Sequence, residues 1–68
     1  MASVAKVTEI TATSPVNFEQ AIQEGITKAN ETLRHVQGAW VKEQKVVIDE
    51  GEITGYQVDM KVTFVMDS

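Results

Sequence analysis

The residues that could do chemistry in this sequence are few, and most of them are carboxylates. Asp49, Glu50 and Glu52 form an acidic turn around Gly51, and Ca²⁺ prefers carboxylate and carbonyl oxygens as ligands. Their spacing matches no established calcium-binding loop, so a solvated turn is the simpler interpretation. His35 is the single histidine, whereas metal sites need several convergent groups. We interpret it as an exposed residue or a partner of a helix carboxyl end.

The sequence contains no pattern that is typical of an enzyme. There is no cysteine, no nucleophile elbow and no phosphate-cradling glycine loop. Glu43 and Asp59 are carboxylates in separate segments, and nothing in the sequence indicates that they converge on a substrate. We therefore expect a binding or structural protein rather than an enzyme.

Length and composition favour a small domain that depends on self-association. The chain has 68 residues and no cysteine. A chain of this length buries only about 60% of its unfolded surface, and cores below ~70–80 residues usually need reinforcement. Because disulfides and a histidine-based metal cluster are both absent from the sequence, oligomerisation is the remaining reinforcement. We expect residues 1–68 to form a single domain.

The charge balance and the lack of long apolar runs argue against several kinds of partner. Ten carboxylates against six Lys and Arg leave no basic stripe to neutralise nucleic-acid phosphates. No apolar run approaches the ~20 residues of a membrane-spanning helix, and residues 1–6 lack the regions of a signal peptide. We expect a cytoplasmic protein whose partners are copies of itself and a small molecule, without nucleic acid or membrane.

Residues 14–36 are predicted to form the helix around which the chain is organised. Apolar residues recur there at spacings of three and four, which places them on one side of a helix. Ser14 suits the N-cap and Pro15 suits the first helical position. Gly25 costs ~1 kcal/mol against alanine within a helix, and we expect it to allow a close approach to the sheet. The apolar stripe consists of Phe18, Ala21, Ile22, Gly25, Ile26, Ala29, Leu33 and Val36.

Residues 4–13, 39–49 and 53–66 are predicted to form three β-strands, because they are rich in β-branched residues or alternate in polarity. The acidic turn joins the last two strands into an antiparallel hairpin. The third strand alternates most clearly, and its apolar face should meet the helix. Strands this long leave sheet surface that one helix cannot cover, which again favours self-association. The expected core is Phe18, Ile22, Ile26, Leu33, Val58, Met60, Val62 and Phe64.

Six segments spread along the chain match one family of proteins: Thr13-Ser14-Pro15, Phe18-Glu19-Gln20-Ala21-Ile22, Thr32-Leu33-Arg34-His35, Val41-Lys42-Glu43, Tyr56-Gln57-Val58 and Lys61-Val62-Thr63-Phe64. No single segment is a sharp motif, but their order and spacing are specific together. On these segments, nearly the whole chain resembles the dodecin family. The resemblance implies an α+β fold in β-α-β-β order, with a three-stranded antiparallel sheet partly wrapped around one helix. It also implies assembly into a hollow homododecamer.

The resemblance also implies flavin sequestration without catalytic turnover. In flavin-binding dodecins a glutamine holds the pyrimidine edge of the ring, and Gln57 matches that position. Its amide offers a donor and an acceptor to a ring edge that has both. Glu43, Gln44 and Lys45 match positions that line the same pocket, and Lys45 could meet a phosphate as a point charge. Without the resemblance, these residues would be interpreted as solvent-facing polar groups of the strands.

The match breaks at the tryptophan on which the flavin ring stacks in the family. An ungapped alignment places Gly38 at that position, and the single tryptophan, Trp40, follows two residues later. Residues two apart share a strand face but lie ~6.6 Å apart along it. Trp40 is therefore either a relocated stacking platform or a residue of a subunit interface, where aromatic residues are enriched. Gly38 could equally be the stop signal of the helix.

Two functions of different kinds follow from these observations. The first is flavin binding and storage by a dodecin-like shell, with FMN or riboflavin as the ligand. The second is a flavin-free assembly that binds calcium or another small ligand, or that is purely structural, as some dodecins without the aromatic platform are described as calcium-binding. In this second function, Asp49, Glu50 and Glu52 are the candidate ligands.

Overall fold

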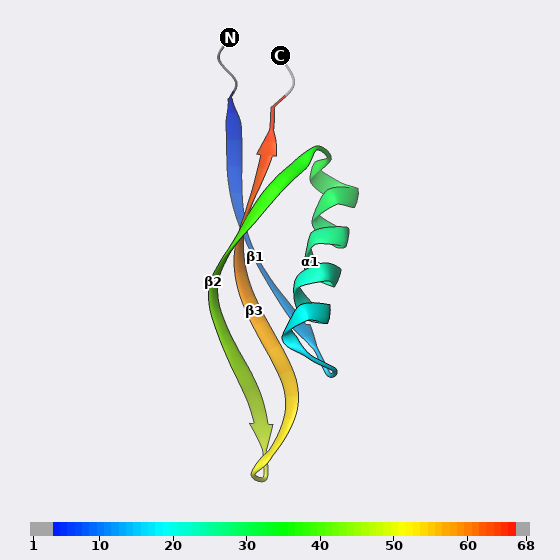
Figure 1. Ribbon diagram of the computed structural model, residues 1–68, viewed down its shortest axis with the longest axis vertical. Helices are drawn as coiled ribbons and strands as arrows, with labels where there is room; N and C mark the ends of the chain where they lie inside the picture. Colours follow the sequence, from blue (N-terminus) through cyan, green and yellow to red (C-terminus); the bar gives the residue numbers. More distant parts are fainter. Residues whose placement is uncertain (1–3, 67–68) are drawn as a thin grey trace.

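A single helix packs on one face of a three-stranded antiparallel sheet (Figure 1). The computed structural model describes residues 4–66, with β1 (Ala5–Ser14), α1 (Phe18–Leu33), β2 (Val36–Asp49) and β3 (Glu52–Val65) in chain order. The strand order is β1-β3-β2, so β3 pairs with both of the other strands. The β2–β3 hairpin continues past the helix as a free arm (Figure 1). The predicted α+β fold in β-α-β-β order is confirmed.

The start of α1 differs from the prediction that Ser14 caps the helix. Asn17 is the N-cap, and its Oδ1 accepts a hydrogen bond from the Gln20 N–H at 2.7 Å. Ser14 is instead the buried last residue of β1. Its Oγ donates to Gln20 Oε1 at 2.5 Å and accepts from the Val16 N–H at 3.0 Å. Ser14 and Asn17 both suit an N-cap, and Asn17 takes the role because β1 continues through Ser14.

The end of α1 contains two non-glycine residues in the left-handed region of the backbone. Arg34, the C-cap, has φ 61° and ψ 157°, and His35 has φ 51°. The chain then enters β2 at Val36, which is earlier than the predicted start at residue 39. Gly38 therefore lies inside β2, and its suggested role as the stop signal of the helix is wrong.

The core forms where the helix lies closest to the central strand. Val58, Met60 and Val62 of β3 are fully buried, as predicted from their alternation. The buried helix residues are the small ones: Ala21, Gly25 and Ala29. Phe18 and Ile22 pack beside this core, and the Phe18 ring meets Tyr56 edge-on at 5.1 Å between centroids. The other predicted core residues, Ile26, Leu33 and Phe64, are only partly buried in the single chain.

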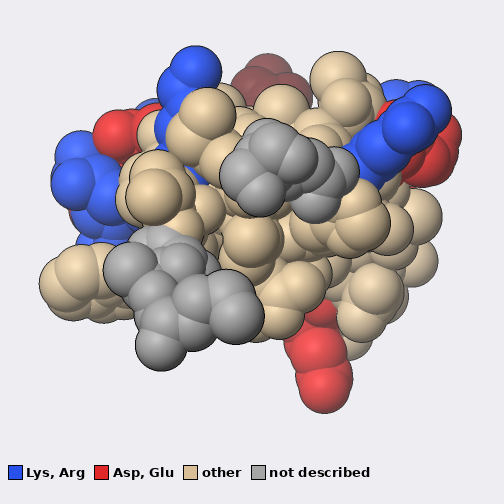
Figure 2. Space-filling model, turned by 90° about the horizontal axis from the view of Figure 1, so that it is seen from above, with Lys and Arg blue, Asp and Glu red and all other residues tan. Residues whose placement is uncertain are grey.

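Much apolar surface remains uncovered. The side chain of Trp40 is 75% exposed, and Val7, Ile48 and Ile53 are each more than half exposed. Viewed along the long axis, uncharged side chains form most of the surface and the charged ones gather at its margins (Figure 2). An exposed apolar area like the one around Trp40 is typical of an interaction surface.

Within residues 4–66, no helix is long and apolar enough to cross a membrane.

Gly25→Ala is expected to lower the free energy of unfolding by roughly 1 kcal/mol, although alanine is the better helix former by ~1 kcal/mol. A Cβ at residue 25 would lie 2.7 Å from Met60 Cε and 3.0 Å from Ala12 Cβ. Chemical denaturation at a fixed protein concentration measures the difference. The control Glu24→Ala changes an exposed neighbour and should stay within about 0.5 kcal/mol of the native value. A more stable Gly25→Ala variant would contradict this close packing.

Arg34→Gly is expected to raise the free energy of unfolding. Non-glycine residues in sparsely populated backbone regions cost about 1–3 kcal/mol each, and Arg34 combines φ 61° with ψ 157°. Glycine also gives the unfolded chain more conformational freedom. This lowers the free energy of unfolding by ~0.4–1 kcal/mol and offsets part of the gain. Arg34→Ala is the matched control, because it removes the same side chain but keeps the backbone strain. An Arg34→Gly variant no more stable than Arg34→Ala would contradict the prediction, because the relief of strain would then not exceed the entropic cost of glycine.

Candidate functional site

The face of the sheet that the helix leaves open carries a small polar notch. It is lined by Thr11, Glu43, Gln44, Lys45, Gln57 and Asp59, and its volume is about 130 Å³. Strand pairing brings these residues together, because Gln57 lies opposite both Thr13 and Lys45, and Asp59 lies opposite both Thr11 and Glu43. The notch therefore joins four residues predicted from the sequence, Glu43, Gln44, Lys45 and Gln57, on two neighbouring strands.

Alternation along β3 explains why the notch lies on this face. Val58 and Met60 point into the core, so Gln57 and Asp59 point to the opposite face, as successive residues of a strand do. Both side chains are partly buried. The β2–β3 register shifts between Val41 and Glu43, and such an irregularity re-aims the side chains that follow it. The notch thus depends on the same strand that forms the core.

The notch is too small to enclose an organic ligand. Sites for drug-sized molecules usually have about 300–1,000 Å³, whereas this one has about 130 Å³. It offers an amide at Gln57, an ammonium group at Lys45 and carboxyl groups at Glu43 and Asp59. Such a set can bind the polar edge of a ligand by hydrogen bonds and charge, but it cannot cover the faces of a ring.

Two other predicted site residues, Gly38 and Trp40, lie further along the sheet. Trp40 is opposite Lys61 and Gly38 is opposite Thr63. At a rise of ~3.3 Å per residue, these positions are ~13 Å and ~20 Å along β3 from Gln57. A side chain at residue 38 would have open space, since a Cβ built there meets nothing within 4 Å. Within one chain, the structure does not bring positions 38 and 40 to the notch.

Charged side chains beside the notch form a connected group. Lys42 Nζ lies 3.3 Å from Glu9 Oε2, and Thr11 Oγ1 donates to Asp59 Oδ1 at 3.5 Å. The hydrogen bond between the Glu9 and Asp59 carboxyls raises the pKa of Asp59 and lowers the pKa of Glu9. The hydrogen bond and charge of Glu9 raise the pKa of Lys42. All of these groups are solvated, so each effect is partly screened.

Sequence reasoning missed the roles of Glu9, Thr11 and Asp59. Alternation alone would have placed Asp59 on the same face as Gln57, two residues away. The position of Thr11 beside Asp59 can be found only from the register of the β1–β3 pairing, in which these two residues lie opposite each other. Glu43 and Asp59, which the sequence left as separate carboxylates, are direct neighbours across β2 and β3.

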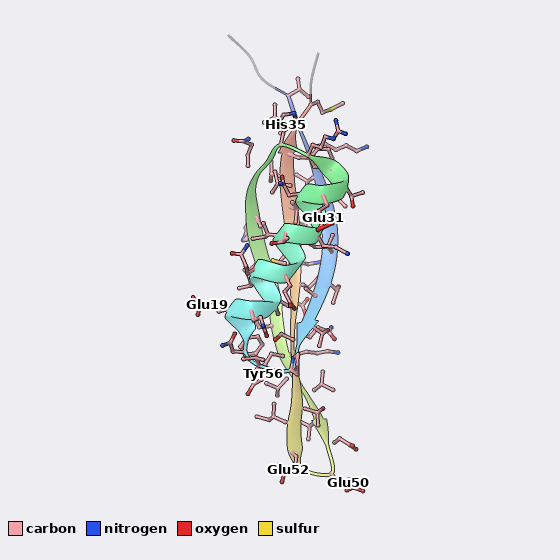
Figure 3. The ribbon with its side chains drawn as sticks, turned by 90° about the vertical axis from the view of Figure 1, so that its right-hand side faces the viewer. Glu19, Glu31, His35, Glu50, Glu52 and Tyr56 are labelled. Atoms are coloured by element: carbon pink, nitrogen blue, oxygen red, sulfur yellow. The ribbon has the colours of Figure 1, made fainter. Side chains whose placement is uncertain are left out.

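The acidic turn is far from the notch. Glu50 and Glu52 lie at the free end of the hairpin, whereas Glu19 and Glu31 lie on the helix and His35 is near the opposite end (Figure 3). Gly51 has φ 79° and Glu50 has φ 49°, as a tight turn requires. Among the described residues, no three histidine or acidic side chains are grouped closely enough to hold a metal ion.

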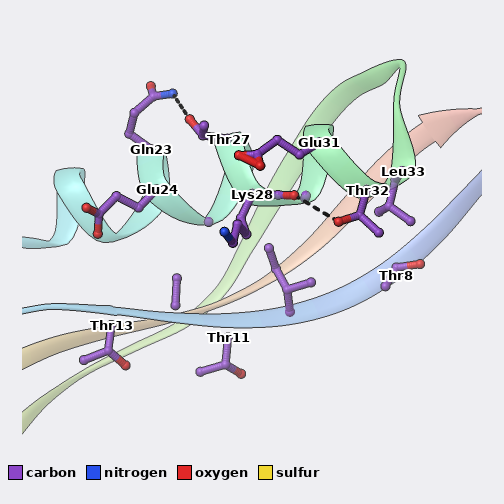
Figure 4. A pocket seen from close by; sticks show the side chains of 14 residues that line it. Thr8, Thr11, Thr13, Gln23, Glu24, Thr27, Lys28, Glu31, Thr32 and Leu33 are labelled. Carbon is purple, nitrogen blue, oxygen red and sulfur yellow. Dashed lines mark hydrogen bonds between the residues drawn. The ribbon is translucent and has the colours of Figure 1, made fainter.

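A larger groove of about 750 Å³ lies between α1 and β1. Apolar residues such as Ile10, Ala12 and Leu33 line it together with polar helix residues (Figure 4). Gln23 Nε2 donates to Thr27 Oγ1 at 3.2 Å there, so part of its polar wall is bonded within the helix. The groove follows β1, which pairs with β3 alone. An open groove beside a free strand edge suits contact with another chain.

Comparisons with known proteins agree with this architecture. The family model for dodecin matches residues 4–67. Dodecin from Thermus thermophilus is 39% identical over 64 residues, which are 94% of this chain and 93% of that protein. A protein named calcium dodecin from Mycobacterium tuberculosis is 38% identical over 65 residues, covering 94% of this chain and 90% of the other.

Solved structures give the same result in three dimensions. Dodecin from Streptomyces davaonensis superposes over the full length of both chains with a TM-score of 0.95 and 37% identity. Calcium dodecin from Mycobacterium tuberculosis, described as having a novel calcium-binding site, has a TM-score of 0.84 and 34% identity. That likeness covers 96% of this chain and 93% of the other. The protein therefore belongs to the dodecin family.

Proposed function

We propose that this protein is a non-catalytic subunit of a homo-oligomeric shell that sequesters a small planar ligand, with flavin as the leading candidate. The observation that carries the proposal is the position of Gln57 in a polar notch on the open face of the sheet. A glutamine amide presents one donor and one acceptor side by side. The pyrimidine edge of a flavin has the complementary groups. Lys45, opposite Gln57, is available to the phosphate of FMN.

A second copy of the chain must complete such a site. The notch takes only one edge of a flavin, and Trp40 is ~13 Å away along the same sheet. A ring held at Gln57 would therefore need a covering surface from another subunit. The highly exposed side chain of Trp40 and the open space at Gly38 are both on the surface available to that subunit. In this proposal, ligand binding therefore requires assembly of the subunits.

Calcium binding is the second candidate function, favoured by the relative named calcium dodecin. Asp49, Glu50 and Glu52 supply suitable oxygen ligands, but they lie at an exposed hairpin end. Since no group of three such side chains is present among residues 4–66 of one chain, carbonyl oxygens or ligands from another copy would have to complete a calcium site. Flavin remains the leading candidate because the notch already gathers its polar residues within one chain.

The purified protein is expected to be a homo-oligomer of about twelve subunits, because one small core and no covalent reinforcement leave much apolar surface to bury. Val7, Trp40, Ile48 and Ile53 contribute to this uncovered surface. Size-exclusion chromatography with light scattering measures the mass. Ile48→Lys, on the exposed hairpin arm, should weaken assembly, whereas Glu19→Lys, at an exposed position in the first turn of α1, should not. A folded monomer at micromolar concentration would disprove the proposal.

Native protein is expected to bind riboflavin weakly, and Gly38→Trp should increase the affinity roughly 5- to 150-fold by supplying a stacking surface of ~1–3 kcal/mol. Titration of flavin fluorescence measures both affinity and quenching. Trp40→Ala should change the affinity little. Gln57→Ala should weaken any binding, because the ring edge loses a paired donor and acceptor.

Two results of this titration would change the interpretation. Tight native binding that Trp40→Ala abolishes would make Trp40 the platform and reject the alignment of Gly38 with the stacking position. Protein that binds no flavin in any variant, but takes up calcium in a calorimetric titration, would reject flavin in favour of the second function.

A further inference from the structure

The β2–β3 hairpin extends beyond the part of the sheet that α1 and β1 support (Figure 1). β1 ends at Ser14, opposite Tyr56, so residues 47–55 form an arm of only two strands. A two-stranded hairpin is marginally stable in water by itself. Ile48 and Ile53 lie opposite each other on this arm and are 59% and 54% exposed. The arm therefore carries apolar side chains that residues 4–66 of its own chain leave uncovered.

The groove between α1 and β1 is an open hollow with apolar walls. Its volume of about 750 Å³ lies within the ~300–1,000 Å³ of sites that enclose drug-sized molecules, so it has room for several side chains. Ile10 and Leu33 line it and are only partly buried. Gly25 and Ala29 line it from the helix, and their small size leaves this room. Because β1 also has a free edge there, the groove suits an extended apolar segment.

The arm cannot reach the groove of its own chain. The hairpin end, marked by Glu50 and Glu52, and His35 beside the end of α1 lie at opposite ends of the molecule (Figure 3). The longest dimension of the molecule is 53 Å. β2 and β3 stay paired from the core to the turn, so the arm continues away from the helix and does not fold back (Figure 1). An arm in the groove must then belong to another chain.

Charge favours a contact between an arm and a groove over a contact between two arms. The acidic turn forms the exposed tip of the arm, and two such tips repel each other because like charges in contact are unfavourable. Lys28 lines the groove and is a cation that the tip can meet. Glu24 and Glu31 also line the groove. The apolar side chains behind the tip, rather than its charge, must therefore supply most of the contact.

We propose that the groove between α1 and β1 binds the arm of a second copy of this chain, with Ile48 and Ile53 as its apolar anchors. The contact joins two different surfaces, so each copy offers its arm to one neighbour and its groove to another. Head-to-tail contacts of this kind form rings when the rotation closes. The free edge of β1 can pair with a strand of the arriving arm, as in other strand additions. The inference rests on the self-association in the proposed function, but it needs no ligand.

Photo-crosslinking tests this contact, because the sequence has no cysteine and a single thiol can be introduced where it is needed. Glu52→Cys, at an exposed position next to Ile53, carries a benzophenone maleimide. Mixing with isotope-labelled chains lets mass spectrometry separate contacts between chains from contacts within one. We expect the probe of one chain to label residues 8–13 or 23–33 of another. The control Glu19→Cys, in the first turn of α1, carries the same probe outside the groove and should not label the arm.

Truncation of an anchor gives a second measurement. Ile48→Ala should raise the concentration at which the assembly dissociates by roughly 10-fold, the order expected when an aliphatic side chain buried in a contact is shortened. Val16→Ala is the matched control, because Val16 is 58% exposed but lies outside the arm and the groove. Light scattering over a dilution series measures both variants.

The outcomes separate this inference from the proposed function. Assembled protein in which the Glu52→Cys probe labels another arm, the open face of the sheet or no protein residue overturns the contact between arm and groove and leaves the proposed function intact. Equal effects of Ile48→Ala and Val16→Ala do the same. Native protein that is a monomer at micromolar concentration overturns the proposed function and this inference with it.

Discussion

The close approach of α1 to β3 is the constraint on which the rest of the structure depends. Ala21 packs with Val58 and Met60 in the core, and a Cβ added at Gly25 would lie 2.7 Å from Met60 Cε and 3.0 Å from Ala12 Cβ. Small residues bring the helix close, but they also make the core small. One short helix then covers only part of one sheet face, so the opposite face and the hairpin arm are left free for other contacts.

Because the helix covers only one face of the sheet, the core and the notch lie on opposite sides of β3. Tyr56, Val58 and Met60 of β3 alternate with Gln57 and Asp59. A slip of the β3 register by one residue would exchange the two sets. Burial of Val58 and Met60 therefore holds Gln57 and Asp59 on the open face. These residues of the notch need little structure of their own, because the core already determines their direction.

The parts of the fold that the sequence predicts are those that depend on local periodicity. The alternation of β3 correctly indicated the burial of Val58, Met60 and Val62. The apolar stripe located α1, and the close approach expected at Gly25 is confirmed. The burial of Ala21 and Ala29 in place of Ile26 and Leu33 was not foreseen, because small residues gain contact only when the helix packs closely. Ser14 was mistaken for the N-cap because the extent of β1 is decided by its pairing with β3.

Prediction of the candidate site was limited in the same way. Gln57, Glu43, Gln44 and Lys45 could be placed together through the family resemblance, and the notch contains all four. The diagonal relation of Glu9 to Asp59 required the β1–β3 register, which no pattern within either strand encodes. No distance from positions 38 and 40 to Gln57 follows from the sequence alone, and in the same chain they lie ~13–20 Å from it along the sheet. Under the proposed function, ligand binds to associated chains and not to separate ones. Ligand and assembly must then stabilise each other by mass action, and dilution that separates the subunits would also release the ligand.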